Sequence, residues 1–583
     1  LLPCPMKPIE LAKYHPILAI QEGVVFASNG NLVMAYRLEL PEIYSLSEGD
    51  FEALHSTWFQ ALKSLPAGTV VQKQDVYLKE TFDNSGLPSN SFLAEATRKH
   101  FDGRQHMLHS SYLFFIYSKN KSLNNSAVIN PFKKVSSAIP SLLEENLKTF
   151  VRQVGDTVSF LNNSKKLTLA PMTADAFRVY TRSYFNGFEQ DVDTDMLNDK
   201  DLQIGDHYWD ILSVNSELCF GETVNTSIPN AQFSSDAYCF HQGFLDGIGL
   251  ALQENHIVNQ ILYLDDKQKW RKILERRIEE LKKSSRFGTQ NQVILTRAQD
   301  ILDRINEDEH ARIIRGHLNI QYWDASKARL AAIASKIKAE LKELDIRPYY
   351  PKGQRRTQYF INSYPCYASY FSDSDLYVSD LKASLCLWIK NTAYRSDPTG
   401  ILFQDRVFNV PVFKDVWDSA KKRIKARNFA IFAPTGEGKS FLANNILRQY
   451  FEDGVRLVII DLGGSYAKFA QLYPKEHIIL RYRPGASLGI NPFYVPSPEV
   501  VAADHLEDLT QFLIELLASD TPMNKTGEVA LKKVLRHYYL EVRTGHSMDS
   551  FYGFLKASRS DLLDKLDIPA SYLSLDYVLH ILS

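Results

Sequence analysis

The sequence contains little cysteine and no long apolar run. Its five cysteines, spread over 583 residues, are far apart and form no CxxC pair, which argues against a disulfide framework and a zinc site. No apolar run approaches the roughly 18 residues that a transmembrane helix needs. The first residues lack an initiator Met, and also the basic stretch and apolar core of a signal peptide. These absences predict a protein of a reducing compartment, the cytoplasm.

A strong charge of either sign is also missing. The 67 Lys and Arg residues balance 68 Asp and Glu residues, which gives a net charge of -1 and a pI of about 7.0. A global basic field for nucleic acid or an anionic membrane is therefore excluded, whereas a local basic patch is not. The charged segment Trp270–Lys283 is one candidate patch. Because glutamates interleave with its bases, the pattern favours a solvated helix face instead.

The N-terminal part has the patterns of a mixed α/β domain. Asn29-Gly30 is a strong hairpin signal between two apolar runs. The spacing of Phe51, Leu54, Trp58, Leu62 and Leu65 predicts a helix with one apolar face. We expect a small sheet with helices on one face. Its predicted elements are strands at Val24–Ser28, Leu32–Leu40, Val70–Leu78 and Ser111–Tyr117, and a helix at Phe51–Leu65.

A second α/β unit is predicted further along the chain. We expect Ser136–Phe185 to be mostly helical and the polar segment Asn186–Thr226 to be irregular or lid-like. Tyr349–Gly353 resembles a linker, so the predicted domains are residues 1–350, with 1–190 and 230–350 as candidate subdomains, and residues 351–583. The remaining elements are strands at Ile257–Leu264 and Ile313–Trp323, helices at Lys267–Lys283, Gln292–Ile305 and Ala325–Leu344, and a β-hairpin region at Gly400–Pro411.

One motif carries recognisable chemistry. The apolar run Asn428–Phe432 has the length of a strand, Ala433–Ser440 reads APTGEGKS, and Phe441–Tyr450 has helical spacing without a breaker. Strand, glycine-containing turn and helix form the context of a Walker A phosphate-binding loop. A chance match in a surface loop is the alternative, and the flanking patterns disfavour it.

The residue types explain how such a loop would bind ATP. Gly436 and Gly438 let the backbone curl around a phosphate with its N–H groups pointing inward. The helix N-terminus adds a partial positive charge. Lys439 is expected to reach the β- and γ-phosphates, and the Ser440 hydroxyl to bind the bridging Mg²⁺. The predicted catalytic residues are Lys439 and Ser440, with Ser440 also the metal ligand. The predicted nucleotide-binding residues are Pro434, Thr435, Gly436, Glu437, Gly438, Lys439, Ser440, Phe441 and Asp461.

Two features depart from a complete motif set. The first consensus glycine is replaced by Ala433, which tolerates positive φ less well. Arg456–Ile460 reads as a buried parallel strand ending at Asp461. Because Leu462-Gly463-Gly464 follows, we do not interpret it as a Walker B motif, and no later apolar run ends in Asp-Glu. The catalytic carboxylates are therefore expected beyond Ser583, in a longer protein.

Specific motifs support a family resemblance. Asp461–Tyr466 (DLGGSY) and Ile490–Phe493 (INPF), downstream of a Walker A motif, resemble the motor ATPases of conjugation and type IV secretion. Segments of the N-terminal part are similar to the TraG-type ATPase of conjugative transposons. These segments are His15–Ile20, Ala35–Pro41, Val71–Asp75, Asn255–Gln260 and Ser285–Phe287.

The resemblance implies a fold and a function. The N-terminal α/β part would be a docking domain, followed by a RecA-like P-loop NTPase domain with a mainly parallel sheet. The protein would be an ATPase that energises a DNA-transfer channel at the inner face of the cytoplasmic membrane. Its partners would be other channel subunits and inner-membrane components, and it would assemble as a homo-oligomer, often a hexamer. Asp461 would help to organise Mg²⁺ or water near the γ-phosphate, or would only cap the following turn. Asn491 also matches a family motif position, and its alternative role is only to shape a loop.

Two other functions stay open. One is a DNA-translocating hexameric ATPase of the FtsK or HerA kind, and direct contact with DNA is undecided. A neutral chain without a DNA-binding motif disfavours this function. The other is a nucleotide-binding scaffold that uses ATP only for assembly of the channel. Hydrolysis measured alongside nucleotide affinity would separate the scaffold from a motor.

Overall fold

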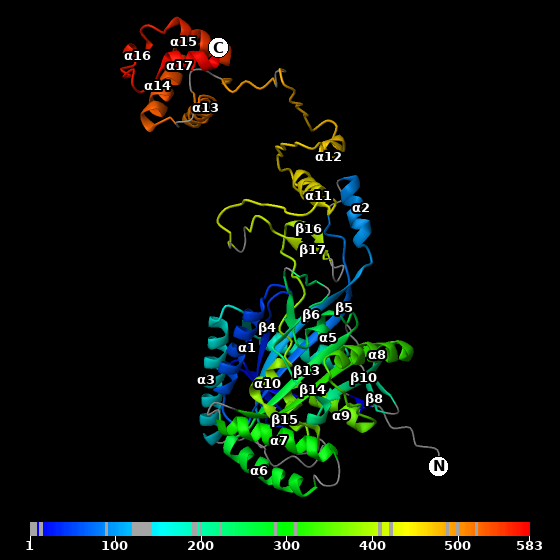
Figure 1. Cartoon of the computed structure of the whole chain (residues 1–583). Helices are drawn as coiled ribbons and strands as arrows, with labels where there is room; N and C mark the ends of the chain where they lie inside the picture. Colours follow the sequence, from blue (N-terminus) through cyan, green and yellow to red (C-terminus); the bar gives the residue numbers. More distant parts are fainter. Residues whose placement is uncertain are drawn as a thin grey trace. The chain divides into compact units, whose positions relative to one another are not determined.

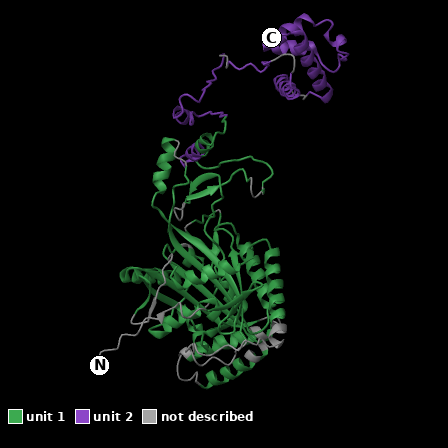
Figure 2. Ribbon diagram, turned by 180° about the vertical axis from the view of Figure 1, so that it is seen from behind, with its two compact units in different colours: residues 1–434, 446–457 green, residues 435–445, 458–583 purple. Residues whose placement is uncertain are grey.

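The computed structural model of the chain (Figure 1) falls into two compact units, coloured separately in Figure 2. Unit 1 contains residues 1–434 and 446–457, and unit 2 contains residues 435–445 and 458–583. Among the residues that the structure describes, no helix is both long and apolar enough to span a bilayer. These residues are 9–10, 16–87, 91–118, 141–188, 195–198, 201–221, 223–231, 233–236, 238–284, 289–307, 312–405, 411–418, 422, 424–485, 489–496, 501–518 and 523–583.

Unit 1 is built on a single 13-stranded sheet in which all the paired strands are antiparallel. Two further strands lie off the main path: β15 (Tyr377–Asp380) pairs with β14, and β7 (Thr168–Pro171) pairs with β4. The path runs β1 (Ile9–Glu10), β8 (Asp195–Asn198), β9 (Leu202–Ile204), β10 (His207–Val214), β14 (Ile313–Asp324), β13 (His256–Leu264), β5 (Thr69–Thr81), β6 (Gln105–Tyr117), β4 (Leu32–Glu39), β3 (Val24–Ala27) and β2 (Ile17–Gln21).

Helices cover both faces of this sheet. Side chains alternate between faces along a strand, and in β5 Val71 and Tyr77 join one apolar cluster whereas Val70 and Val76 join the other. This explains why β5 is buried without a break from Thr69 to Tyr77. One face carries α1 (Glu48–Lys63), α3 (Ser141–Asn163), α5 (Asp246–Leu250), α8 (Lys327–Glu343) and α10 (Leu381–Cys386); the other carries α4 (Ala174–Phe185), α9 (Gln354–Asn362) and the 3-10 helix η4 (Pro365–Tyr370).

Most of the predicted N-terminal elements are confirmed. The Asn29-Gly30 turn joins β3 to β4, and the predicted apolar face of α1 is fully buried. The helix begins at a capping box in which Ser47 and Asp50 satisfy each other's backbone N–H groups. The helices predicted at Lys267–Lys283 and Gln292–Ile305 are α6 (Lys267–Ser284) and α7 (Thr289–Glu307). In the predicted β-hairpin region, β16 (Ile401–Gln404) pairs with β17 (Pro411–Lys414). Residues 136–140 and Ser285–Phe287 lie outside the described residues.

Two expectations about this part were wrong. The sheet is large and covered on both faces, not small with helices on one face. Residues 186–226 are not irregular throughout, because β10 (His207–Val214) lies inside the sheet beside β14. Trp209 of β10 stacks on Trp323 at 4.3 Å between ring centroids. Polar residues interrupt the apolar alternation of β10, so its strand character was overlooked. The remaining short elements of unit 1 are η2 (Glu217–Cys219), η5 (Asp373–Asp375), β11 (Ser227–Pro229), β12 (His241–Gly243) and α2 (Phe92–Phe101).

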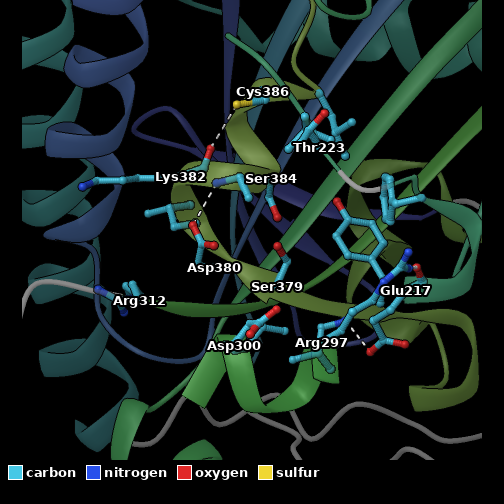
Figure 3. Close-up of a pocket in the computed structure, with 18 of the residues that line it drawn as sticks. Glu217, Thr223, Arg297, Asp300, Arg312, Ser379, Asp380, Lys382, Ser384 and Cys386 are labelled. Atoms are coloured by element: carbon cyan, nitrogen blue, oxygen red, sulfur yellow. Dashed lines mark hydrogen bonds between the residues drawn. The ribbon is translucent and has the colours of Figure 1, made fainter. Parts of the chain in front are cut away.

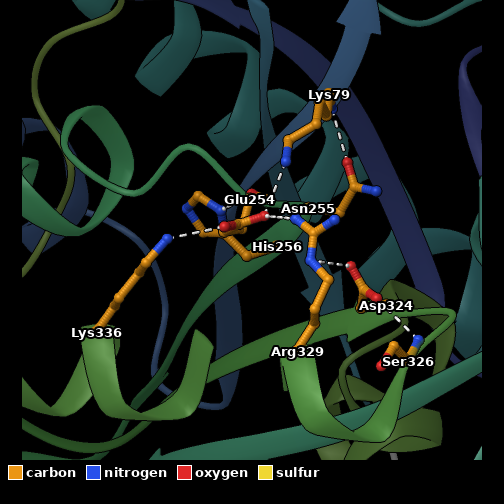
Figure 4. A network of polar contacts seen from close by, with 8 residues as sticks. All are labelled: Lys79, Glu254, Asn255, His256, Asp324, Ser326, Arg329 and Lys336. Carbon is orange, nitrogen blue, oxygen red and sulfur yellow. Dashed lines mark hydrogen bonds and ion pairs between the residues drawn. The ribbon is translucent and has the colours of Figure 1, made fainter. Parts of the chain in front are cut away.

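A charged network ties α8 to the centre of the sheet (Figure 4). The buried carboxylate of Glu254 accepts hydrogen bonds from Lys79 at 2.8 Å, Lys336 at 2.9 Å and Arg329 at 3.2 Å. The neighbouring Asn255 side chain accepts the backbone N–H of Lys79 at 2.7 Å. Burial alone would raise the pKa of Glu254, but the hydrogen bonds from Lys79 and Lys336 lower it overall. One carboxylate therefore holds together β5, the start of β13 and α8.

Glu254→Gln is expected to destabilise unit 1 by about 2 kcal/mol, because three cations lose the anion that they share. Lys336 and Arg329 are more than half exposed, and solvent screening reduces the effect below that of a fully buried pair. Denaturant unfolding measures the loss. Glu343→Gln is the matched control, because Glu343 is an exposed residue of α8, the helix that carries Arg329 and Lys336. Equal stability of the two variants would contradict the role given to Glu254.

Unit 2 contains a helical cluster that the sequence patterns did not predict. Its helices are α13 (Ala503–Leu516), α14 (Lys525–Glu541), α15 (Met548–Ala557), α16 (Leu562–Lys565) and α17 (Leu575–Leu582). They share an apolar core that includes Leu513, Val534, Tyr538 and Phe551. The apolar run at the end of the sequence is α17, and it packs in this core through Leu575 and Val578. A short helix, α12 (Ala467–Gln471), precedes the cluster.

The parallel sheet expected around the Walker A motif is not seen among the described residues. Neither Asn428–Phe432 nor Arg456–Ile460 forms a strand, and Phe432, Val458 and Ile460 are at least 90% exposed. The prediction of a buried strand at Arg456–Ile460 therefore differs from the structure. The physical reason is that a buried parallel strand needs paired neighbours and helices on both faces. Apolar composition alone does not supply them.

Candidate phosphate-binding site

The APTGEGKS segment forms an open loop at the start of a long helix. Helix α11 spans Lys439–Glu452 and begins directly after the loop. Gly436 and Gly438 have φ angles of +92° and +83°, a region that other residues avoid. No atom would lie within 4 Å of a Cβ at either position, so conformation and not crowding requires glycine there. The loop residues from Pro434 to Gly438 are exposed, as are Ser440 and Phe441.

Ala433 takes the place of the first consensus glycine without strain. It is partly buried and is absent from the residues with positive φ. Because an alanine pays a conformational penalty only in the left-handed region, this departure from the consensus costs the loop nothing. The loop conformation therefore depends on Gly436 and Gly438.

This arrangement fits a phosphate group. Two glycines in the left-handed region turn the backbone so that successive N–H groups can face one anion. The N-terminus of α11 adds a partial positive charge to the same field. Lys439 belongs to that turn, so its positive charge lies near the loop. The structure thus places the predicted residues from Pro434 to Phe441 in one continuous loop and helix start.

This loop offers few side-chain ligands for a divalent cation. Among the described residues, no group of three or more His, Cys, Asp or Glu side chains is arranged to hold a metal ion. Magnesium binds proteins through few side chains and relies on phosphate oxygens and water. The exposed hydroxyl of Ser440 suits that mode, since the phosphates would bring most of the ligands.

Asp461 caps its own loop. One carboxylate oxygen accepts the N–H of Gly463 and the other accepts the N–H of Tyr466, both at 3.0 Å. These hydrogen bonds, led by the one from Tyr466, lower the pKa of Asp461. Gly464 in the same loop has a φ of +71°. Of the two roles considered for Asp461, this geometry displays the capping one.

Asn444 links the Asp461 loop to the phosphate-binding helix. Its amide nitrogen donates to the carbonyl of Ser440 at 2.8 Å and to that of Ser465 at 3.4 Å. Sequence reasoning missed this residue, because an asparagine in mid-helix carries no signal of its partner. The INPF motif lies elsewhere: Asn491 donates to the carbonyl of His546 at 2.6 Å, and Phe493 is buried in the helical core. Asn491 therefore holds its loop against the residues that precede α15.

Unit 1 contains a separate cavity of about 650 Å³ between α1, α7, β15 and α10 (Figure 3). Three of its charged side chains form hydrogen bonds with the surrounding backbone. Arg297 donates to the carbonyl of Glu217 at 2.6 Å, and the Glu217 carboxylate accepts the N–H of Val378 at 3.0 Å. Asp380 accepts the N–H of Ala383 at 2.8 Å as the cap of α10. These hydrogen bonds hold the wall of the cavity together and do not indicate a function for it.

Comparison with known proteins identifies two segments. Residues 400–583 match the TraG P-loop domain, and residues 5–56 match a domain of unknown function, DUF3875. No match to a curated protein was found. The first match contains the phosphate-binding loop, the Asp461 loop and the INPF motif. The chain therefore carries a TraG P-loop domain at residues 400–583, with a DUF3875 segment near its N-terminus.

Proposed function

We propose that the protein is an ATPase that energises a conjugative type IV secretion channel and binds Mg-ATP at Thr435–Ser440. The observation that carries the proposal is the glycine loop at the start of α11, inside a TraG P-loop domain. That domain supports a conjugation-associated NTPase. ATP as the nucleotide, Mg²⁺ as the metal and the motor role are the finer parts of the proposal.

Each part of the loop has its own role in binding the triphosphate. The amides of Thr435–Gly438 and the first turn of α11 hold the phosphates, and Lys439 neutralises the charge of the β- and γ-phosphates. The Ser440 hydroxyl is a ligand for Mg²⁺, which supplies further charge neutralisation when bound. Asp461 keeps the neighbouring loop in shape, and Asn444 holds that loop to the helix. No described side chain is assigned to water activation.

We further propose a RecA-like parallel sheet for the assembled domain. The exposed apolar runs at Asn428–Phe432 and Arg456–Ile460 support it, because exposed apolar surface costs about 25 cal/mol per Å². We also propose that the protein forms a hexamer at the inner face of the cytoplasmic membrane and contacts channel subunits there. The absence of a strong net charge favours protein partners over direct, nonspecific DNA binding.

The test is DNA transfer from donor cells whose transfer system carries only a variant chain. Lys439→Ala is expected to reduce transfer at least about a hundredfold at normal protein level, because one lost charge contact to the phosphates costs that much in turnover. Lys475→Ala removes the same charge from an exposed turn and serves as the control. Full transfer with Lys439→Ala would overturn the motor role. If DNA transfer needs ATP binding but the protein hydrolyses no ATP, the scaffold function is favoured. If the protein binds DNA tightly and in a salt-dependent manner, the translocase function is favoured.

A further inference from the structure

The last turns of α11 are bound to two other elements of unit 1. The side-chain amide of Gln449 forms a pair of hydrogen bonds with one residue of β16: its oxygen accepts the N–H of Leu402 at 2.8 Å, and its nitrogen donates to the carbonyl of Leu402 at 3.1 Å. Leu402 is also paired with Phe413 of β17. Gln449 therefore takes the place that a neighbouring strand would take at this edge of the hairpin.

A hydrogen bond to a buried carboxylate makes the second attachment. Arg448 and Glu452 approach to 2.6 Å, and their side chains are only 6% and 5% exposed. Glu452 also accepts a hydrogen bond from the hydroxyl of Ser91. Ser91 is the N-cap of α2, where its side chain accepts the N–H of Ala94 at 3.0 Å. One carboxylate thus connects the end of α11 to the first turn of α2.

The contact at Glu452 differs from an ordinary surface contact, because the Arg448 and Glu452 side chains are both buried. Arg448 and Glu452 are both residues of α11, so their ion pair orients the Glu452 carboxylate, and the hydrogen bond from Ser91 makes the attachment to α2. Helix α11 is continuous from Lys439 to Glu452, so its first and last turns belong to one element. The first turn carries the phosphate-binding residues. The last turn holds α2, which lies in the connection between the central strands β5 and β6.

We propose that Gln449 and Glu452 are positioning residues that fix the phosphate-binding helix to β16 and α2, so that nucleotide binding stabilises α2. The proposal rests on the proposed nucleotide binding at Thr435–Ser440. Coupling of this kind is reciprocal: the factor by which ATP stabilises folded α2 equals the factor by which folded α2 tightens ATP binding. Loss of either attachment therefore weakens both effects together.

The experiment measures tryptic cleavage at Arg98 and Lys99 of α2, with fragments identified by mass spectrometry. Cleavage inside a helix requires local opening, so its rate reports the stability of α2. Mg-ATP is expected to slow this cleavage roughly fivefold in the unmodified chain. In Glu452→Ala the slowing is expected to vanish, and the Kd for a fluorescent ATP analogue to rise by roughly the same factor. Gln449→Ala tests the β16 attachment and should give a partial loss of both.

Gln471→Ala, at an exposed position of α12, is the control and should behave as the unmodified chain does. If ATP binds in a Lys439-dependent manner but leaves cleavage at α2 unchanged, the coupling is overturned and nucleotide binding stands. The coupling is equally overturned if Glu452→Ala and Gln449→Ala keep the full slowing. If ATP does not bind the unmodified chain at all, the proposed function itself fails.

Discussion

Lys439→Ala is expected to weaken binding of Mg-ATP by about a hundredfold or more. Lys439 is the first residue of α11 and directly follows the two glycines that turn the loop. Charge-assisted hydrogen bonds to phosphate are about twice as strong as neutral ones, and the loop amides alone cannot replace the lost charge. Titration with a fluorescent ATP analogue at fixed ionic strength measures the change.

Lys475→Ala separates this local effect from a general loss of positive charge. Lys475 is exposed in the same unit, so its replacement should leave the Kd within about twofold, the scatter expected for a screened surface charge. Equal losses in the two variants would indicate nonspecific attraction of ATP. An unchanged Kd in Lys439→Ala would remove Lys439 from the site.

The second large effect is acid destabilisation of unit 1. Burial, the leading cause in each case, lowers the pKa of His55, His256 and His317 to about 4. Each ring has one buried nitrogen without a hydrogen-bond partner: Nδ1 of His55, and Nε2 of His256 and His317. A proton on that nitrogen would be a charge that no neighbouring group accepts, so the folded state excludes it.

The sign follows from the comparison with the unfolded chain, whose histidines titrate near pH 6.5. A depressed folded pKa gives stability that is present above about pH 6.5 and is lost as the pH falls toward 4. At pH 5 each of the three histidines is expected to cost about 2 kcal/mol, or roughly 6 kcal/mol together if their effects add. Unfolding in denaturant at pH 7 and pH 5 measures the difference.

His317→Gln supplies the variant for this test. His317 packs against Phe371 at 4.0 Å between ring centroids, and its Nδ1 hydrogen-bonds the carbonyl of Asp375 at 2.8 Å. Its replacement lowers stability at pH 7 but should remove about 2 kcal/mol of the loss on acidification. His100→Gln, at an exposed position, is the control substitution. A stability that is flat between pH 7 and pH 5 would contradict the neutral state of these rings.

Local patterns sufficed for much of unit 1. The face of α1 that contains Phe51 and Trp58 was predicted because helix period and burial agree there, and the Asn29-Gly30 turn needs only its own two residues. The glycine loop before α11 was predictable for the same reason. Its glycines act through their own φ angles and not through distant partners.

Other features depend on partners that are remote in sequence. His207–Val214 is a strand because β14, on the order of a hundred residues later, lies beside it and pairs with its backbone. The roles of Asn444, Gln449 and Glu452 require Ser465, Leu402 and Ser91, and no local pattern announces such pairs. Arg456–Ile460 shows the converse case: its apolar run predicted a strand, but no described neighbour pairs with it.

Hydrogen exchange of the unmodified chain, with and without Mg-ATP, tests the central claim most directly. The claim is that the open loop before α11 holds the triphosphate. The predicted result is slower exchange of the backbone amides of Gly436–Ser440, because amides that bond phosphate are shielded from solvent. Saturating Mg-ATP that leaves these amides unprotected, while other segments become protected, would contradict the claim.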